Sequence, residues 1–156
     1  MSDDRCLEAQ PVRQAEAALL SGLHAACFEV AWSAEDFEAL LSQPTVWAAV
    51  GRRDDCPTGF GLCRQAADEV ELLTFAVLPA WRRRGIAAEI LQQILSECLR
   101  RGANHLFLEV AEGNLPARRF YRKWSFFEFG RRPGYYRHPG QQAEDAILMR
   151  YDLLSK

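Results

Sequence analysis

The stretch Arg82-Arg83-Arg84-Gly85-Ile86-Ala87, here called the arginine stretch, carries the strongest indication of the fold. It lies between an apolar run, Val70 to Val77, and an amphipathic segment that ends near Arg101. The first amides of a helix lack partners within the helix and carry a partial positive charge. A glycine-bearing turn before such a helix binds phosphate or pyrophosphate through backbone N–H groups. The arginine stretch therefore predicts a site for a phosphorylated ligand, with a solvated basic turn as the alternative.

Helices and strands alternate on both sides of the arginine stretch. Apolar spacing predicts helices over residues 12–28, 85–101 and 114–123, and Ser33-Ala-Glu-Asp36 is a capping-box pattern that begins another. Strands are predicted over residues 45–51, 60–64, 70–77, 105–111, 127–131 and 146–153. Residues 53–59 are interpreted as a hairpin connection and residues 133–142 as a loop. This alternation favours an α/β fold with a mixed sheet covered by helices on both faces.

The composition is that of an ordinary soluble domain. The 156 residues suit one domain, and a net charge of −2 argues against a dedicated nucleic-acid binder. The first residues lack the basic and apolar regions of a signal peptide, and no apolar run approaches the roughly 20 residues of a membrane span. We therefore expect a cytoplasmic protein with neither membrane nor direct nucleic-acid binding.

Cysteines and histidines do not indicate a metal site or a disulfide framework. The five cysteines are widely separated without a C-x-x-C pair, and Cys63 and Cys98 fall at apolar positions typical of buried thiols. The three histidines, His24, His105 and His138, show no metal-ligand spacing. They are interpreted as structural or surface residues, and no metal is expected.

Four ordered motifs carry a family resemblance. They are Leu73-Thr-Phe-Ala-Val77, the R-x-x-G-x-A pattern of the arginine stretch, Leu106-Phe-Leu-Glu-Val110, and Asn114-x-Pro-Ala-x-x-x-Tyr121. Together they resemble the GCN5-related N-acetyltransferase (GNAT) superfamily. The sequence is most similar to bacterial RimI-type ribosomal-protein-alanine N-acetyltransferases, through Trp32-Ser33, the Glu-to-Tyr spacing, Arg131-Arg132-x-x-Tyr135-Tyr136 and Glu144-Asp-Ala-Ile-Leu-Met149. The resemblance runs from about Leu7 to Leu153.

The resemblance implies a GNAT fold and a coenzyme site. It implies a single N-acetyltransferase domain over residues 1–156, with a mostly antiparallel twisted sheet, a splayed parallel pair, and helices on both faces. The co-substrate is acetyl-CoA, and the residues implied to bind it are Phe75, Ala76, Val77, Arg83, Arg84, Gly85, Ile86, Ala87, Ala88 and Asn114. The sequence departs from the family at Arg82, where Gln is common, at Ala87, where Gly is common, and at Trp124-Ser125-Phe126, where Leu-Gly-Phe is usual.

Acetyl transfer from a thioester to an amine needs a base for the amine and an acid for the leaving thiolate. Glu109 lies in an otherwise apolar strand, where a carboxylate takes up a proton more readily than in water. Tyr121, near the end of the next predicted helix, offers a phenol as the acid. The resemblance implies the same two roles, and Glu71 on the neighbouring strand is the second candidate base. The alternatives are a surface-paired Glu109 and a core-packing Tyr121.

The acceptor is implied by the resemblance alone. RimI-like enzymes build the peptide-facing wall at the positions of Trp32, Arg132, Tyr135 and Tyr136. The resemblance thus implies direct acetyl transfer in a ternary complex to a protein N-terminus, notably the N-terminal alanine of a small-subunit ribosomal protein. Two alternatives remain: an N-acetyltransferase for small amines such as polyamines or aminoglycosides, and a non-catalytic acyl-CoA-binding module. Retention of both Glu109 and Tyr121 argues against the latter.

Overall fold

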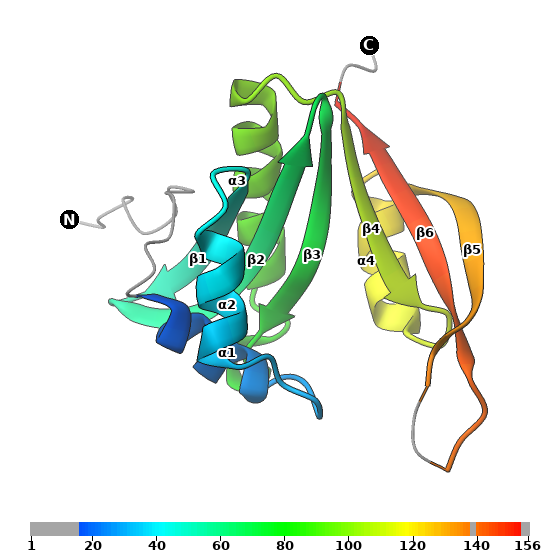
Figure 1. The fold of residues 1–156 in the computed structure, drawn as a ribbon, viewed down its shortest axis with the longest axis horizontal. Coiled ribbons are helices and arrows are strands. Elements are labelled where there is room, and N and C mark those ends of the chain that lie inside the picture. Colours follow the sequence, from blue (N-terminus) through cyan, green and yellow to red (C-terminus); the bar gives the residue numbers. More distant parts are fainter. Residues whose placement is uncertain (1–15, 138–139, 154–156) are drawn as a thin grey trace.

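The computed structural model describes residues 16–137 and 140–153. Within these residues, six strands form one sheet in the order β1-β2-β3-β4-β6-β5 (Figure 1). Their bounds are β1 (Val46–Arg53), β2 (Cys56–Ala66), β3 (Glu69–Val77), β4 (His105–Ala111), β5 (Phe127–Tyr136) and β6 (Glu144–Asp152). This mixed sheet, with helices on both faces, confirms the predicted α/β class.

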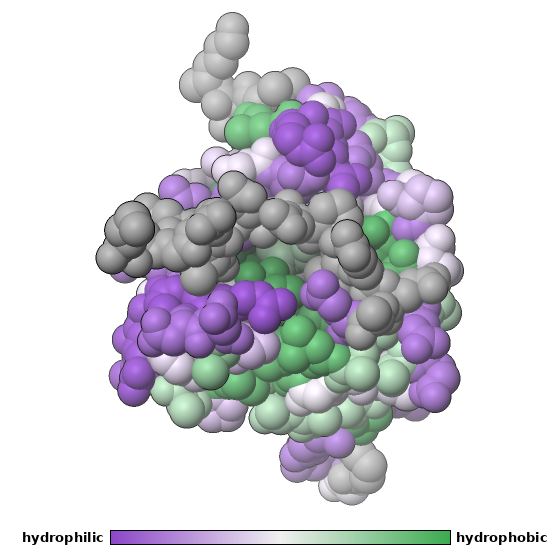
Figure 2. Space-filling view, turned by 90° about the vertical axis from the view of Figure 1, so that its left-hand side faces the viewer, coloured by the Kyte–Doolittle hydropathy of each residue, from purple (hydrophilic) through white to green (hydrophobic). Residues whose placement is uncertain are grey.

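In the described part of the chain, two helices cover each face of the sheet. On one face α1 (Ala17–Ala25) and α2 (Ala34–Leu41) pack over β1 to β3, in a cluster centred on Leu20, Phe37 and Phe60. On the other lie α3 (Ile86–Arg100) and α4 (Leu115–Lys123), with a short 3-10 turn η3 (Pro79–Trp81) before α3 (Figure 1). Figure 2 shows that hydrophobic residues reach the surface on the side that faces left in Figure 1, where hydrophilic residues surround them.

Local capping explains where the helices begin. The Ser33 hydroxyl accepts the Asp36 N–H at 3.1 Å, and the Asp36 carboxylate accepts the Ser33 N–H at 2.9 Å, which is the predicted capping box of α2. Asn114 caps α4 by accepting the Ala117 N–H at 3.3 Å. Gly85 precedes α3 with φ of 79°, a left-handed conformation that glycine adopts without steric cost.

The parallel pair β3 and β4 separates soon after it forms. Its pairing runs from Glu69 opposite His105 to Glu71 opposite Phe107, whereas every other strand pair is antiparallel. Beyond Glu71 the two strands diverge and leave the V-shaped opening seen in the middle of Figure 1. The predicted splayed parallel pair is therefore confirmed, and it creates the space for a ligand.

Two predicted connections are present but have different bounds in the structure. The turn between β1 and β2 is only Asp54-Asp55, with φ of 50° and 66°, so β2 already begins at Cys56. Aspartate tolerates the left-handed region, and a two-residue turn with both φ values positive matches the twist of a hairpin. β5 continues to Tyr136, beyond the predicted loop start at Pro133, because the proline falls in an irregular part of the ladder.

Hydrogen bonds from side chains hold this last part of β5. Asp145 accepts the Gly134 N–H at 2.9 Å and Nη1 of Arg131 at 2.8 Å. These bonds lower the pKa of Asp145, with the Arg131 guanidinium as the larger cause. Residues 12–15 of the first predicted helix, and also Cys6 and His138, lie outside the described residues. Among the described residues no helix is long and apolar enough to cross a membrane.

Candidate active site

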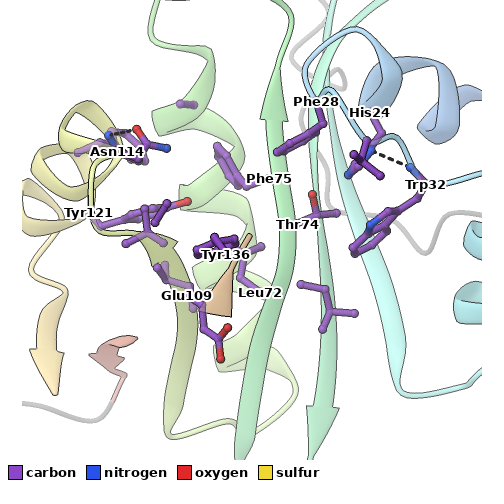
Figure 3. A pocket seen from close by; sticks show the side chains of 18 residues that line it. His24, Phe28, Trp32, Leu72, Thr74, Phe75, Glu109, Asn114, Tyr121 and Tyr136 are labelled. Atoms are coloured by element: carbon purple, nitrogen blue, oxygen red, sulfur yellow. Dashed lines mark hydrogen bonds between the residues drawn. The ribbon is translucent and has the colours of Figure 1, made fainter. Parts of the chain in front are cut away.

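A cleft of about 500 Å³ occupies the opening between β3 and β4. Its walls come from α1, β3, β4, α3, α4 and the end of β5. Figure 3 shows the side chains that line it, with Asn114 and Tyr121 on one side, His24, Phe28 and Trp32 on the other, and Glu109 near its narrow end. Segments that are far apart in the sequence thus contribute to one cavity.

Tyr121 presents a buried phenol to this cleft. Its side chain is 7% exposed, and its ring lies 5.3 Å from Phe120 and 5.4 Å from Phe126, measured between ring centroids. Burial raises the pKa of Tyr121 well above its ordinary value, and the nearby Cys63 thiol adds to the rise. The hydroxyl therefore keeps its proton at neutral pH and can act as a proton donor.

Glu109, on β4, provides a carboxylate in the same cleft. Alternation along β4 buries Leu108 and Val110 against the α3 side and turns Glu109 to the other face, where its side chain remains 20% exposed. One oxygen lies 3.1 Å from Nε of Arg132. Burial is the main cause that raises the pKa of the neighbouring Tyr136, and the charge of Glu109 is the second. Glu109 thus faces the cleft as a paired carboxylate.

The arginine stretch forms an exposed turn at the start of α3. Ile86 anchors the helix in the core, whereas Arg83 and Arg84 face solvent. Arg84 stacks over the Trp81 ring, with 5.1 Å between the guanidinium carbon and the ring centroid. Arg82 is used structurally, because its Nε donates to the Val77 carbonyl at 3.0 Å. Two of the three arginines thus remain available for a phosphate group.

The turn and the cleft are continuous through Ala87, the second residue of α3, which lines the cleft. Phe75 and Asn114 also line it, so three of the residues predicted to bind the coenzyme meet there. Ala76 and Val77 are buried in the two cores and do not contribute lining side chains. The remaining predicted residues, Arg83, Arg84, Gly85, Ile86 and Ala88, lie at the start of α3 outside the cleft lining.

The predicted acceptor-side residues divide between two hollows. Trp32 and Tyr136 line the main cleft. Arg132 lines a second hollow of about 380 Å³, which shares Leu108 and Glu109 with the first. Tyr135 lines neither and is exposed on β5. Glu71, the second candidate base, lies only in the second hollow, where it pairs with Arg64 at 3.3 Å.

Sequence reasoning missed several lining residues, among them His24, Phe28 and Thr74. His24 was overlooked because a lone histidine near a helix end is usually structural. The spacing of four residues between His24, Phe28 and Trp32 is the signal that could have found them. Within residues 16–137 and 140–153 no cluster of three or more histidine, cysteine, aspartate or glutamate side chains could hold a metal.

The site is thus a cleft between splayed strands that opens beside a helix N-terminus and is lined by a carboxylate and a buried phenol. Residues 18–126 match the model of the acetyltransferase (GNAT) family, and the chain belongs to that family. This agrees with the resemblance carried by the arginine stretch and the Glu-to-Tyr spacing.

The chain is similar to individual N-acetyltransferases in sequence and in fold. The ribosomal protein bS18-alanine N-acetyltransferase of Haemophilus ducreyi is 32% identical over 90 residues, which cover 58% of this chain and 62% of that protein. The chain therefore matches less than two thirds of that relative's length. The crystal structure of the Escherichia coli ribosomal-protein-S18-alanine N-acetyltransferase shares the fold, with a TM-score of 0.87, 22% identity and 96% of each chain covered. Arabidopsis thaliana NAA60 in complex with acetyl-CoA has a TM-score of 0.78 at 22% identity, covering 96% of this chain and 99% of that one.

Proposed function

We propose that this protein transfers an acetyl group from acetyl-CoA to the N-terminal α-amine of a protein, with the N-terminal alanine of ribosomal protein bS18 as the foremost acceptor. The observation that carries the reaction is the presence of Glu109 and Tyr121 in one cleft that opens beside the N-terminus of α3. The identity of the acceptor is supported by the relative that acts on bS18. A ribosomal acceptor implies a cytoplasmic reaction.

The coenzyme is proposed to lie along the cleft with its pyrophosphate at the arginine stretch. The first amides of α3, which follow the left-handed Gly85, have no partners within the helix and would bind the phosphate oxygens. Arg83 and Arg84 are exposed there and add positive charge. The acyl arm would pass Ala87 and Phe75 toward Tyr121, all of which line the cleft.

The proposed transfer is direct and balances its protons. Glu109 takes a proton from the α-ammonium group, and the neutral nitrogen attacks the thioester carbonyl carbon. The C–S bond then breaks, and Tyr121 donates its hydroxyl proton to the departing thiolate. The second proton that the nitrogen loses on becoming an amide returns to the Tyr121 oxygen, and the proton on Glu109 leaves to solvent. An α-amine has an ordinary pKa of about 7.7–8.0, against about 10.4 for lysine, so one carboxylate suffices as the base. Both substrates must be bound at once, since no covalent enzyme intermediate is needed.

One assay tests this function. Release of free CoA from acetyl-CoA is measured with peptides that differ in their first residue, beside polyamines and aminoglycosides. We expect turnover on the bS18 N-terminal peptide and none on the same peptide already acetylated. Turnover confined to small amines would replace the ribosomal acceptor with the small-amine alternative. Coenzyme binding without turnover on any amine would instead indicate a non-catalytic binding module.

A further inference from the structure

His24, in the last turn of α1, is the one histidine that lines the cleft among the described residues. Only 3% of it is exposed. Its ring stacks on Phe28 at 4.2 Å and on Trp32 at 4.9 Å between ring centroids, with interplanar angles of 23° and 24°. The two aromatic neighbours hold the imidazole in one plane. This side chain is therefore fixed in place before any ligand arrives.

One hydrogen bond determines which ring nitrogen carries the proton. Nδ1 of His24 accepts the backbone N–H of Trp32 at 3.1 Å (Figure 3). A neutral imidazole has one donor and one acceptor nitrogen, so the proton lies on Nε2. Burial lowers the pKa of His24, which favours this neutral form. Among residues 16–137 and 140–153, no side chain or carbonyl accepts a hydrogen bond from Nε2, which is not one of the fully buried polar atoms without a partner and so remains accessible to a ligand.

The position of the ring places the Nε2–H donor in the half of the cleft that would hold the amine substrate. Figure 3 shows His24 across the cavity from Tyr121 and Asn114, on the side where Trp32 and Phe28 lie. The coenzyme-side residues Ala87 and Asn114 come from α3 and α4, on the other face of the sheet. A ligand atom that meets Nε2 thus belongs to the amine substrate and must be a hydrogen-bond acceptor.

We propose that His24 is a specificity-determining residue whose Nε2–H donates a hydrogen bond to the carbonyl oxygen of the acceptor's first residue. This inference rests on the proposed function and deepens it. In a protein N-terminus that carbonyl is attached to the same carbon as the reacting amine, so both groups enter the cleft together. An alkylamine lacks the carbonyl and offers no acceptor to this N–H once it fills the cleft, which disfavours its binding. His24 thus selects aminoacyl groups over simple amines.

Two substitutions distinguish the role of Nδ1 from the role of Nε2. The amide oxygen of His24→Asn replaces Nδ1 and still accepts the Trp32 N–H, but it removes the donor in the cleft. The longer amide of His24→Gln places an N–H near the position of Nε2. His105→Asn is the matched control, because His105 lies on β4 outside the cleft lining and pairs with Asp152 at 2.8 Å.

The first test is the steady-state kinetics of the full chain with an alanine-initiated peptide and saturating acetyl-CoA. We expect His24→Asn to raise KM for the peptide about tenfold, as for loss of one hydrogen bond, with kcat changed less than threefold. His24→Gln recovers most of the loss, and His105→Asn retains the wild-type KM. A wild-type KM in His24→Asn would overturn the inference.

The second test reports the hydrogen bond itself. With CoA bound, the Nε2 NMR resonance of His24 is followed while alaninamide or isopropylamine is added; isopropylamine keeps the methyl group and lacks the carbonyl. We expect a shift with alaninamide only, and equal shifts or none with both would contradict the inference. If the wild-type protein fails to acetylate the peptide, the proposed function fails, whereas the alaninamide shift still decides the role of His24.

Discussion

Arg132 and Glu109 form an ion pair that crosses a strand: Nε of Arg132 on β5 lies 3.1 Å from Oε1 of Glu109 on β4, and β6 runs between these strands. The Arg132 guanidinium also lies over the Tyr135 ring, with 5.5 Å between its carbon and the ring centroid. The proposed base is thus held on one side before the substrate binds. An incoming amine must approach the carboxylate from the cleft side, where Tyr136 lies.

Replacing Glu109 by Gln should lower kcat about 100-fold, because a positioned general base contributes about 100-fold or more. Glu71→Gln is the matched control, since Glu71 has the same chemistry on the neighbouring strand but faces only the second hollow. It should change kcat less than threefold. Both values come from CoA release at saturating acetyl-CoA and peptide. A larger loss in Glu71→Gln than in Glu109→Gln would transfer the base role to Glu71.

Arg132→Gln tests whether the ion pair itself supports turnover. Both partners retain contact with water, and such pairs contribute little once salt screens them. We therefore expect kcat/KM to change less than about tenfold, with a weaker dependence on ionic strength than in the wild-type protein. The measurement is kcat/KM from low to high salt. A loss as large as that of Glu109→Gln would mean that Arg132 is needed to orient the carboxylate.

Tyr121→Phe should reduce kcat about tenfold or more while leaving the Kd for acetyl-CoA within threefold, since only the hydroxyl is lost. Burial raises the pKa of Tyr121, so its proton remains bound at alkaline pH. The wild-type rate should therefore not fall through ionisation of this group below about pH 10. Tyr151→Phe is the control, because its ring also packs on Phe126, at 5.4 Å, but it is not part of the cleft.

The stability of the fold should depend on pH through His24. An unfolded histidine has a pKa of about 6.5, and burial lowers the pKa of His24 in the folded protein. Below about pH 6.5 the unfolded chain gains a proton that the folded chain does not, so the free energy of unfolding falls. His24→Phe should flatten this slope. Urea unfolding between about pH 5 and 7.5 measures it, and equal slopes in both proteins would contradict the prediction.

Much of the fold could be predicted because its signals are local. The capping box at Ser33, the cap at Asn114 and the apolar face of α3 each depend on residues within a turn or two. The two-residue turn at Asp54-Asp55 could not be predicted, because a longer loop of similar composition fits the sequence equally well and does not need aspartate in the left-handed conformation. Ser125 is a further case: it takes φ of 72° where the family usually has glycine, so the turn forms despite the substitution.

The site was harder to predict, because it combines side chains that only the sheet brings together. Glu109 and Tyr121 were found through their spacing, which reflects one strand followed by one helix. The ion pair between Arg132 and Glu109 depends on the order of β4, β6 and β5 in the sheet. The spacing of residues along the sequence does not reveal that order. That His24 lines the cleft becomes visible only in the fold, where the end of α1 lies across the cleft from α4.

Gly85 and Gly22 provide a matched pair to test the start of α3. A Cβ at either position would meet nothing within 4 Å, so packing does not distinguish them. Gly85 has φ of 79°, where alanine costs about 1 kcal/mol or more, whereas Gly22 lies inside α1, where alanine is favoured by a similar amount. Gly85→Ala should therefore lower the free energy of unfolding and weaken acetyl-CoA binding, since the turn directs the first amides of α3. Gly22→Ala should raise the free energy of unfolding and leave the Kd for acetyl-CoA unchanged. Urea unfolding and calorimetric titration measure both, and unchanged coenzyme binding in Gly85→Ala would remove the arginine stretch from the proposed pyrophosphate site.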